Sequence, residues 1–316
     1  MQLHPFRPCV RLSLFLTALV FTMPAHSEEV TVMTYNVENM FDVYDNPYTE
    51  DEGTDIKRRD EIVTIANAIE HADADIVVFQ ELENEHMLEG MVSAFLPGQG
   101  YTYIAGQRTN SGRGINLGII SRYPIKRLAS YRFLELTHPE AEGSTWRYAR
   151  DAMHVTLDVN GRDVHVFNVH FKSNGNSPGD PSSMLWRTAE AIMTKSLIRD
   201  IVADDPDAYV LLMGDCNSNY WTDPRQDRPW PATAHLRAAE PDGSHLLIDA
   251  HEGLSHEERV TIPGDDRYPP ATFDYVYASP ALAERIVEGS AFILNDPELT
   301  GGSDHYPTGA TYNIGD

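Results

Sequence analysis

Apolar residues recur along this chain at two spacings, which predict strands in some stretches and helices in others. Alternation with a period of two, or a short run of β-branched and aromatic residues, predicts a strand. The pair Asn160-Gly161 separates two such stretches and is a strong two-residue hairpin turn. The expected strands span residues 29–37, 75–82, 101–105, 116–121, 151–159, 162–172, 209–213, 273–278, 291–294 and 310–313.

Helical periodicity is found between several of these strands. The expected helices span residues 55–71, 86–96 and 182–203, and Lys57 is expected on the solvated side of the first helix. Strand pairs with helices placed outside them favour an α+β fold, in which two sheets pack face to face and helices flank them. No stretch of linker-like composition divides the chain, so residues 28–316 are expected to form a single domain.

Polar side chains follow several of the predicted strands, at the point where each strand ends. Polar residues that recur after apolar runs are what a site along one edge of a sheet sandwich requires. The last of these clusters, Ser303-Asp304-His305 in a Gly-rich turn, contains a histidine, which can gain or lose a proton near neutral pH. The clusters contain Asn36, Glu81, His170, Asp215 with Asn217, and Asp304 with His305.

The N-terminal segment has the composition of an export signal. Two arginines, Arg7 and Arg11, precede an apolar run over residues 12–23, and small residues follow it. This order predicts a secretory signal peptide over residues 1–27, with a mature chain that begins near Glu28. The alternative is a membrane anchor, although the apolar run is short for a span. We therefore expect an exported protein, in the periplasm or the medium.

The charge and the cysteines limit the classes of partner and of chemistry. The 316 residues carry 24 basic and 48 acidic side chains, for a formal net charge of −24, and loss of Arg7 and Arg11 makes the mature chain still more acidic. Broad electrostatic attraction to nucleic acid is thus excluded. Cys9 lies in the signal segment, so Cys216 has no intramolecular disulfide partner and is expected to be a buried structural thiol.

Six short motifs occur in an order that resembles the endonuclease/exonuclease/phosphatase superfamily. They are Thr34-Tyr35-Asn36-Val37-Glu38-Asn39, Gln80-Glu81, Asn168-Val169-His170, Gly214-Asp215-Cys216-Asn217, Asp274-Tyr275 and Ser303-Asp304-His305-Tyr306-Pro307. No single motif is specific, but six in register cover nearly the whole mature chain. The resemblance implies a four-layer α/β/β/α sandwich with two mostly antiparallel sheets. It also implies dependence on Mg²⁺, with Mn²⁺ as a substitute and Ca²⁺ as a further ion.

Residues in the matched positions suit a metal site. Glu81 supplies a hard carboxylate and Asn36 an amide oxygen, a donor set that fits Mg²⁺, which retains several waters. Asp304 is expected to bind the metal or a water. The structural alternatives are a strand-end salt bridge for Glu81 and a turn for Asn36.

Other matched positions suit phosphodiester hydrolysis, which needs an in-line water and help for the leaving oxygen. Asp215 is expected to orient or deprotonate the water, with Asn217 holding the water or the phosphate, although Gly-Asp-x-Asn also forms Asx turns. The resemblance pairs His305 with Asp274, and the base is either Asp215 or His305. It also implies that His170 faces the phosphate and protonates the leaving group.

Arginines and aromatic residues supply candidates for substrate binding. Arg150 is a candidate phosphate clamp, because arginine binds phosphate in a bidentate manner. The alternative role for Arg150 is a surface ion pair. Arg113 and Asn116 are further phosphate-binding candidates. The aromatic candidates for stacking on bases are Trp146, Tyr148, Trp221 and Trp230.

The leading hypothesis is a secreted metal-dependent phosphodiesterase, an endonuclease that cuts DNA or RNA by metal-assisted water attack. The main alternative is a phosphoesterase for a lipid or a small phosphate, similar to a sphingomyelinase or a sugar-phosphate phosphatase. A binding protein without catalysis is a third alternative, which the retention of all matched polar positions disfavours. We expect a monomer whose partner is its substrate.

Overall fold

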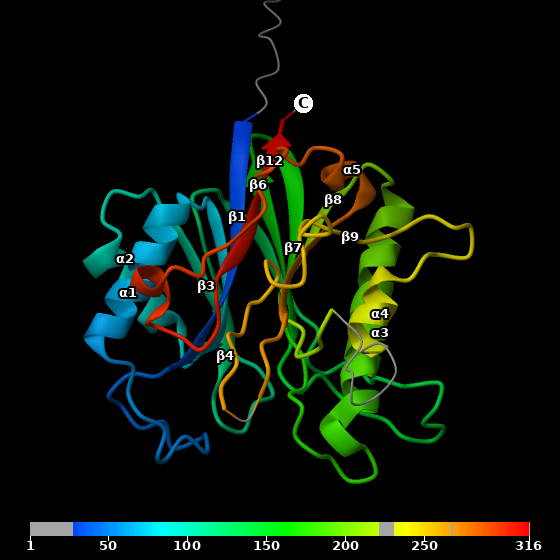
Figure 1. Cartoon of the computed structure of the whole chain (residues 1–316), viewed down its shortest axis with the longest axis horizontal. Helices are drawn as coiled ribbons and strands as arrows, with labels where there is room; N and C mark the ends of the chain where they lie inside the picture. Colours follow the sequence, from blue (N-terminus) through cyan, green and yellow to red (C-terminus); the bar gives the residue numbers. More distant parts are fainter. Residues whose placement is uncertain (1–27, 221–230, 267, 316) are drawn as a thin grey trace, which may run out of the picture.

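The computed structural model describes residues 28–220, 231–266 and 268–315, and two six-stranded sheets dominate it (Figure 1). Two segments with sequence predictions lie outside the described residues: the predicted signal peptide (residues 1–27) and the stretch that holds Trp221 and Trp230. No helix within the described ranges is long and apolar enough to cross a membrane.

The first sheet has the strand order β11-β12-β1-β2-β4-β3. Its central strands β1 and β2 are parallel, and its other neighbouring strands pair in an antiparallel manner. Its strands are β1 (Glu28–Met40), β2 (Ile76–Leu82), β3 (Tyr103–Gln107), β4 (Asn116–Ser121), β11 (Phe292–Ile293) and β12 (Thr308–Ile314).

The second sheet has the order β5-β6-β7-β8-β10-β9 and repeats this pattern, with β7 and β8 as its parallel pair. The Asn160-Gly161 turn joins β6 to β7, as the sequence predicts. Its strands are β5 (Ile125–Ser130), β6 (Ala152–Val159), β7 (Arg162–His170), β8 (Tyr209–Asp215), β9 (Ile248–Asp249) and β10 (Asp274–Ala278).

Helices cover the outer face of each sheet and complete four layers (Figure 1). One apolar cluster lies between the sheets, one lies between the first sheet and α1 with α2, and one lies between the second sheet and α3 with α4. The helices are α1 (Arg59–Ala72), α2 (Glu85–Phe95), α3 (Met184–Asp204), α4 (Pro231–Arg237), α5 (Pro280–Ala283) and α6 (Pro297–Thr300), with a 3₁₀ turn at Pro181–Ser183. The predicted α/β/β/α sandwich is therefore confirmed.

The strand alternation explains the cores. In β6, Met153, Val155 and Leu157 face the other sheet, and Ala152 faces the side of α3. Cys216 is buried in the cluster beside α3, so its predicted structural role is confirmed.

Some predicted boundaries were wrong. Helix α1 begins at Arg59, four residues after its predicted start, because the backbone of Arg58 is extended and acts as the N-cap. Strand β5 was not predicted, because its sequence, Ile-Lys-Arg-Leu-Ala-Ser, lacks a strict alternation. It is an edge strand, and edge strands tolerate charged residues.

Candidate active site

The two parallel strand pairs bring the polar strand-end residues together. Asn36 lies near the end of β1 and Glu81 near the end of β2, while His170 and Asp215 end β7 and β8 in paired register. The antiparallel strand β10 begins at Asp274, directly opposite Asp215. A hydrogen bond from the Asn36 amide to Asp215 joins the edges of the two sheets. The predicted site is thus divided between the sheets.

Asp215 is at the centre of this arrangement and is buried. Its Oδ1 accepts a hydrogen bond from the Asn217 backbone (2.7 Å), so the Asx turn considered from the sequence is present. Its Oδ2 accepts from the Asn217 side chain (3.1 Å) and the Asn36 side chain (3.2 Å). Burial raises the pKa of Asp215 to about 7, the charge of His305 opposes this rise, and Asp274 adds to it.

Gly214 fixes the direction of Asp215. Its φ of +134° is in a region that favours glycine, and a Cβ at this position would collide with the carbonyl oxygen of Val169 in β7. The glycine therefore permits the close approach of the parallel strands at the residue before the carboxylate.

His305 and Asp274 form the dyad that the resemblance implies. The His305 Nδ1 lies 2.8 Å from Asp274 Oδ2, and its Nε2 lies 3.5 Å from the Asn36 amide nitrogen. Ser303 holds the turn, because its hydroxyl accepts from the His305 backbone and donates to the Asn36 carbonyl. Burial alone would lower the pKa of His305, but the carboxylates of Asp274, Asp215 and Asp304 raise it well above its usual value.

His170 is buried between two carboxylates. Its Nε2 lies 3.4 Å from Asp215 Oδ2 and 3.9 Å from Glu81 Oε1, and its Nδ1 has no hydrogen-bond partner among the described residues. Burial, followed by the charge of Arg150, lowers the pKa of His170 well below its usual value. The ring is therefore neutral near pH 7.

Glu81 is held in a strained backbone conformation. Its φ is +68°, and the pairing of β2 with both neighbours is irregular around this residue. One carboxylate oxygen accepts from the Asn39 backbone at 3.1 Å. Non-glycine residues with positive φ cost on the order of 1–3 kcal/mol and occur frequently at functional sites. The bulge turns Glu81 out of the strand's regular alternation.

Glu38 is a carboxylate near the site that the sequence analysis did not select. Its Oε2 accepts from the Asp304 backbone at 3.0 Å, and burial, followed by the charge of Asp304, raises its pKa. Lys57 donates to the Glu38 carbonyl at 2.8 Å, so the expectation that Lys57 is solvated on a helix was wrong. Lys57 precedes α1, because the extended Arg58 is the N-cap and the helix begins at Arg59.

The donor set fits a hard divalent cation. The described residues contain no group of three or more histidine, cysteine or acidic side chains arranged to hold a metal. Mg²⁺ is commonly bound through only one or two carboxylates and several waters. Glu81 and the Asn36 amide lie at one edge, with Glu38 beside Asp304, whose side chain is 62% exposed. Carboxylate and amide oxygens of this kind match Mg²⁺ or Mn²⁺.

Arg150 lies beside the carboxylates rather than in a surface ion pair. Its Nη1 donates to the Phe171 carbonyl at 3.2 Å, and burial lowers its pKa while Glu81, Glu190 and Asp215 raise it. Glu190 of α3, which the sequence analysis missed, accepts from the backbones of Ala149 and Lys172, both at 2.6 Å. This carboxylate therefore ties the Arg150 segment to the chain that follows His170.

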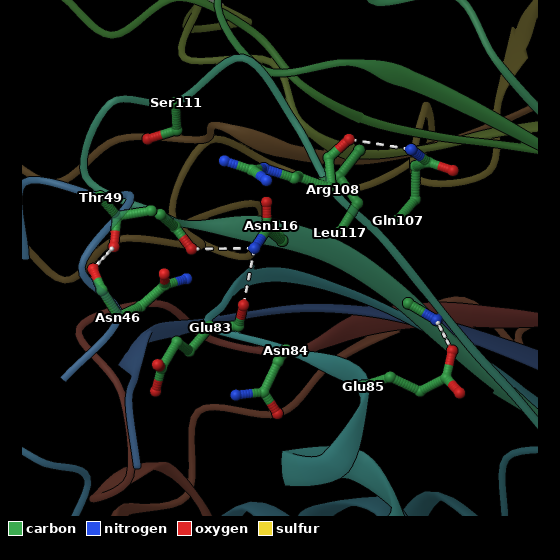
Figure 2. A pocket seen from close by; sticks show the side chains of 12 residues that line it. Asn46, Thr49, Glu83, Asn84, Glu85, Gln107, Arg108, Ser111, Asn116 and Leu117 are labelled. Atoms are coloured by element: carbon green, nitrogen blue, oxygen red, sulfur yellow. Dashed lines mark hydrogen bonds between the residues drawn. The ribbon is translucent and has the colours of Figure 1, made fainter. Parts of the chain in front are cut away.

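The other two phosphate-binding candidates differ: Arg113 lies on the β3–β4 loop and Asn116 is the first residue of β4. Arg113 is exposed and donates to the side chain of Asn39, next to Glu38. Asn116 donates to the carbonyls of Glu83 (2.6 Å) and Gly114 (3.0 Å), and it accepts from the Thr109 backbone. Figure 2 shows Asn116 in the wall of a cavity of about 260 Å³. The structure thus places Arg113 near the site and uses Asn116 to shape its loop.

Comparisons with known proteins agree with this geometry. A model described as "Endonuclease/Exonuclease/phosphatase family" matches residues 31–233. Similar solved structures include the human nocturnin catalytic domain with a bound sulfate anion (18% identity, 90% of this chain and 94% of that chain, TM-score 0.61). A truncated TDP2 from Caenorhabditis elegans is 18% identical over 90% of this chain and 98% of that chain, with a TM-score of 0.57.

A third similar structure is an endonuclease/exonuclease/phosphatase family protein from Bacteroides thetaiotaomicron (18% identity, 92% of this chain and 100% of that chain, TM-score 0.57). At these identities the structural matches show the fold alone. No curated protein matches the chain.

Proposed function

We propose, because the chain belongs to the endonuclease/exonuclease/phosphatase family, that it is an exported, metal-dependent phosphodiesterase that cuts DNA or RNA within the strand. The observation that carries this proposal is the placement of the His305–Asp274 pair and of Asp215 next to the same Asn36 side chain, whose amide donates to Asp215. Export rests on the predicted signal peptide and places the enzyme in the periplasm or the medium. We propose a monomer, whose partner is its substrate.

Asp215 is the group that orients the attacking water and takes its proton. Three N–H groups of Asn36 and Asn217 fix its two oxygens, so the carboxylate has one orientation. Its raised pKa suits a base that works near neutral pH. His170, buried and neutral, contacts the same Oδ2 and steadies it. The sequence alone left the base open between Asp215 and His305, and this geometry favours Asp215.

His305 contacts the scissile phosphate as an imidazolium. Asp274 accepts a hydrogen bond from Nδ1 of His305, which orients the ring and stabilises its positive charge. The other ring nitrogen, Nε2, lies beside Asn36. Arg150, in the segment before β6, is the second cation and binds the same phosphate. The two groups oppose the negative charge that develops on the phosphate oxygens.

Glu81 and Asn36, with Asp304 and Glu38 beside them, would hold the divalent cation, Mg²⁺ or Mn²⁺. When bound, the ion neutralises charge on the non-bridging oxygens and helps the leaving oxygen. The strained backbone of Glu81 supports this role, because it holds a carboxylate at the edge that a regular strand would place elsewhere.

The test is incubation of residues 28–316 with supercoiled plasmid and Mg²⁺, beside an EDTA control and the His305→Ala variant. Nicking is expected only with metal and with His305 present. The His86→Ala variant is a matched control, because His86 is exposed on α2 and pairs with Glu89. Plasmid and RNA that both stay intact with folded, metal-loaded protein would overturn the nuclease assignment.

One observation favours a lipid phosphodiester as the second candidate substrate. The loop after β1 exposes four apolar or aromatic side chains, of which Ile56 lines a cavity together with Glu38 and Asn39: Val43 (69%), Tyr44 (78%), Tyr48 (82%) and Ile56 (53%). Exposed side chains of this type insert into membrane interfaces. The acidic residues around them weaken attraction to anionic lipid. Release of the headgroup from zwitterionic vesicles, lost in a Tyr44→Ser/Tyr48→Ser variant, would favour this candidate.

A further inference from the structure

Cationic and aromatic side chains alternate in a continuous row next to the active site. Arg132 stacks on the ring of Phe133, with its guanidinium carbon 4.5 Å from the ring centroid, and Arg147 lies 5.9 Å from the same centroid. Trp186 donates to the Arg147 carbonyl at 2.8 Å, and the Lys172 ammonium lies 5.5 Å from the Trp186 ring. We call these five residues the arginine–aromatic strip.

The strip is fastened to the catalytic edge at two points. The Asn110 side chain donates to the carbonyls of Arg132 (2.6 Å) and Tyr148 (2.9 Å), and its backbone donates to the Arg150 carbonyl (3.1 Å). At the other end, Glu190 accepts from the backbones of Ala149 and Lys172. The strip therefore runs beside Arg150 and the end of β7.

The strip continues toward the cavity described above. Arg132 donates to the Arg108 carbonyl at 2.6 Å, and Figure 2 shows the Arg108 side chain extending into that cavity. Arg108 and Arg113, both exposed, lie on the loop between Gln107 and Asn116. The loop that bonds to the Arg150 segment thus adds two cations to the strip, in a chain whose formal net charge is −24.

The acidic residues near the strip differ in whether their carboxylates are buried or face solvent. Asp151 and Glu190 are buried and bond to backbone N–H groups, whereas Glu135 is exposed two residues from Phe133. Glu140 and Glu142 are in the loop beyond the bridge between Leu136 and Trp146. The strip is therefore a local basic surface on an acidic protein.

The rings favour bases that are not already paired. Phe133 is 62% exposed and Trp186 is half-buried, so each presents ring surface to solvent. Unpaired bases stack on aromatic rings and on guanidinium planes, while bases in a duplex stack on one another. A membrane is a poorer fit, because two guanidinium groups lie within 6 Å of the Phe133 ring and would have to enter the lipid with it.

Of the aromatic residues selected from the sequence for this purpose, the structure excludes Tyr148. Tyr148 is buried and its hydroxyl bonds to Thr194, so it cannot stack on a base. Trp146 is half-buried and packs on the apolar cluster beside α3.

We propose that the arginine–aromatic strip binds a single-stranded segment of DNA or RNA that extends from the scissile phosphate. Phosphates contact the cations and unstacked bases lie on the rings. This inference rests on the proposed nuclease function and adds to it a binding site for an unpaired segment next to the bond that is cut.

The binding test uses a fluorescent 12-nucleotide single strand of mixed sequence, with EDTA to prevent cleavage. Arg147→Ala and Phe133→Leu are each expected to weaken binding about 10-fold, in line with the contribution of one stacked base, and Phe133→Tyr to retain it. Arg162→Ala is the matched control, since Arg162 also stacks on an aromatic ring (4.3 Å from Tyr209) but lies at the opposite end of β7. Equal affinities for all four variants would overturn the proposal.

The salt dependence separates a phosphate contact from a folding defect. For single strands the log–log slope of affinity against salt is about −0.7 per phosphate contact. Arg147→Ala should reduce the slope by about 0.7, and Phe133→Leu should leave it unchanged. An unchanged slope in Arg147→Ala would count against a phosphate contact and would overturn the assigned role of that residue.

Turnover separates failure of this inference from failure of the proposed function. In Phe133→Leu and Arg147→Ala, kcat/KM for the oligonucleotide should fall about 10-fold, while kcat/KM for bis(4-nitrophenyl) phosphate stays unchanged. If neither substrate is cleaved by the wild type, the proposed function fails. If both are cleaved but the variants match Arg162→Ala, only the strip proposal fails. Loss of binding to anionic vesicles with unchanged oligonucleotide binding would assign the strip to a membrane and overturn it.

Discussion

The charge states of the two histidines in the proposed active site are set by burial and by their neighbours. His305 and His170 are both buried, yet their pKa values shift in opposite directions. Asp274 accepts a hydrogen bond from one ring, whereas Arg150 is a nearby positive charge for the other. The two histidines therefore cannot exchange roles.

Loss of either member of the dyad should reduce the rate of the chemical step. We expect His305→Ala to lower kcat about 1,000-fold and Asp274→Asn about 100-fold, because general acid–base and electrostatic contributions have this size. Metal-dependent turnover of a diester at saturating substrate measures both. A kcat for Asp274→Asn within twofold of the wild type would show that the hydrogen bond to His305 does not matter.

Burial raises the pKa of Glu190 to about 7, against about 4.5 for an unperturbed glutamate. Between these values the unfolded chain loses the proton while the folded protein keeps it, so the free energy of unfolding falls as pH rises from about 4.5 to 7. In Glu190→Gln, the decrease in the free energy of unfolding over this pH range should be smaller by up to about 3 kcal/mol. Urea unfolding of the wild type and of Glu190→Gln at pH 5 and pH 7.5 measures the free energy of unfolding at each pH. An equal change in this free energy between the two pH values for both proteins would contradict the prediction.

The site residues that could be predicted from the sequence have a local sequence pattern, and those that were missed do not. Asp215 and Asn217 follow a buried strand directly, and His305 lies in a short turn with Ser303, so position along the chain was sufficient. Glu38 and Glu190 have no such signal. The role of Glu38 depends on a left-handed φ of +46°, and Glu190 bonds to backbone groups 41 and 18 residues away.

At the scale of single elements, β2 carries strain where it contributes to the site. Glu81→Gly should remove the strain, and Glu81→Ala should keep it, while both abolish metal-dependent turnover. We expect the glycine variant to be more stable than the alanine variant by about 1 kcal/mol. Chemical denaturation of the two variants without metal gives the comparison, and a less stable glycine variant would contradict it.

In strand β8, the position before Asp215 requires glycine, whereas β2 places the non-glycine residue Glu81 at a positive φ. Gly214→Ala should destabilise the protein by about 3 kcal/mol, because the Cβ meets the Val169 carbonyl and the φ is unfavourable. Gly90→Ala is the control, since Gly90 is exposed in α2 with open space around it and should gain about 0.5–1 kcal/mol. Thermal unfolding measures both changes. Similar melting temperatures for the two variants would refute the steric argument.

The elements that the sequence predicted well are those with a strong pattern. The buried runs of β2 and β8 and the Asn160-Gly161 hairpin were located within a few residues. The start of α1 was predicted too early, because residues 55–58 are as polar as a helix terminus. They precede the helix, and Lys57 donates a hydrogen bond to the Glu38 carbonyl. Long-range contacts of this type leave no periodicity to detect.

At the scale of the whole molecule, the negative charge opposes a polyanionic substrate. If DNA is the substrate, cleavage should require millimolar Mg²⁺, more than the catalytic site itself binds, because free cations screen the repulsion. Titration of Mg²⁺ at constant ionic strength, with the plasmid and with bis(4-nitrophenyl) phosphate, should show a higher half-saturation for the plasmid. Saturation of both at a stoichiometric level would contradict the argument.

The division of the site between two sheets has a consequence for how the enzyme matures. Asn36 and Glu81 belong to one sheet, and His170, Asp215 and Asp274 to the other, while His305 comes from the turn before the last strand of the first. Neither half contains a complete set of groups, and β1 cannot complete its sheet until β12, at the far end of the chain, has been synthesised. A nascent or truncated chain therefore lacks part of the site, and the proposed activity requires the whole polypeptide to have folded.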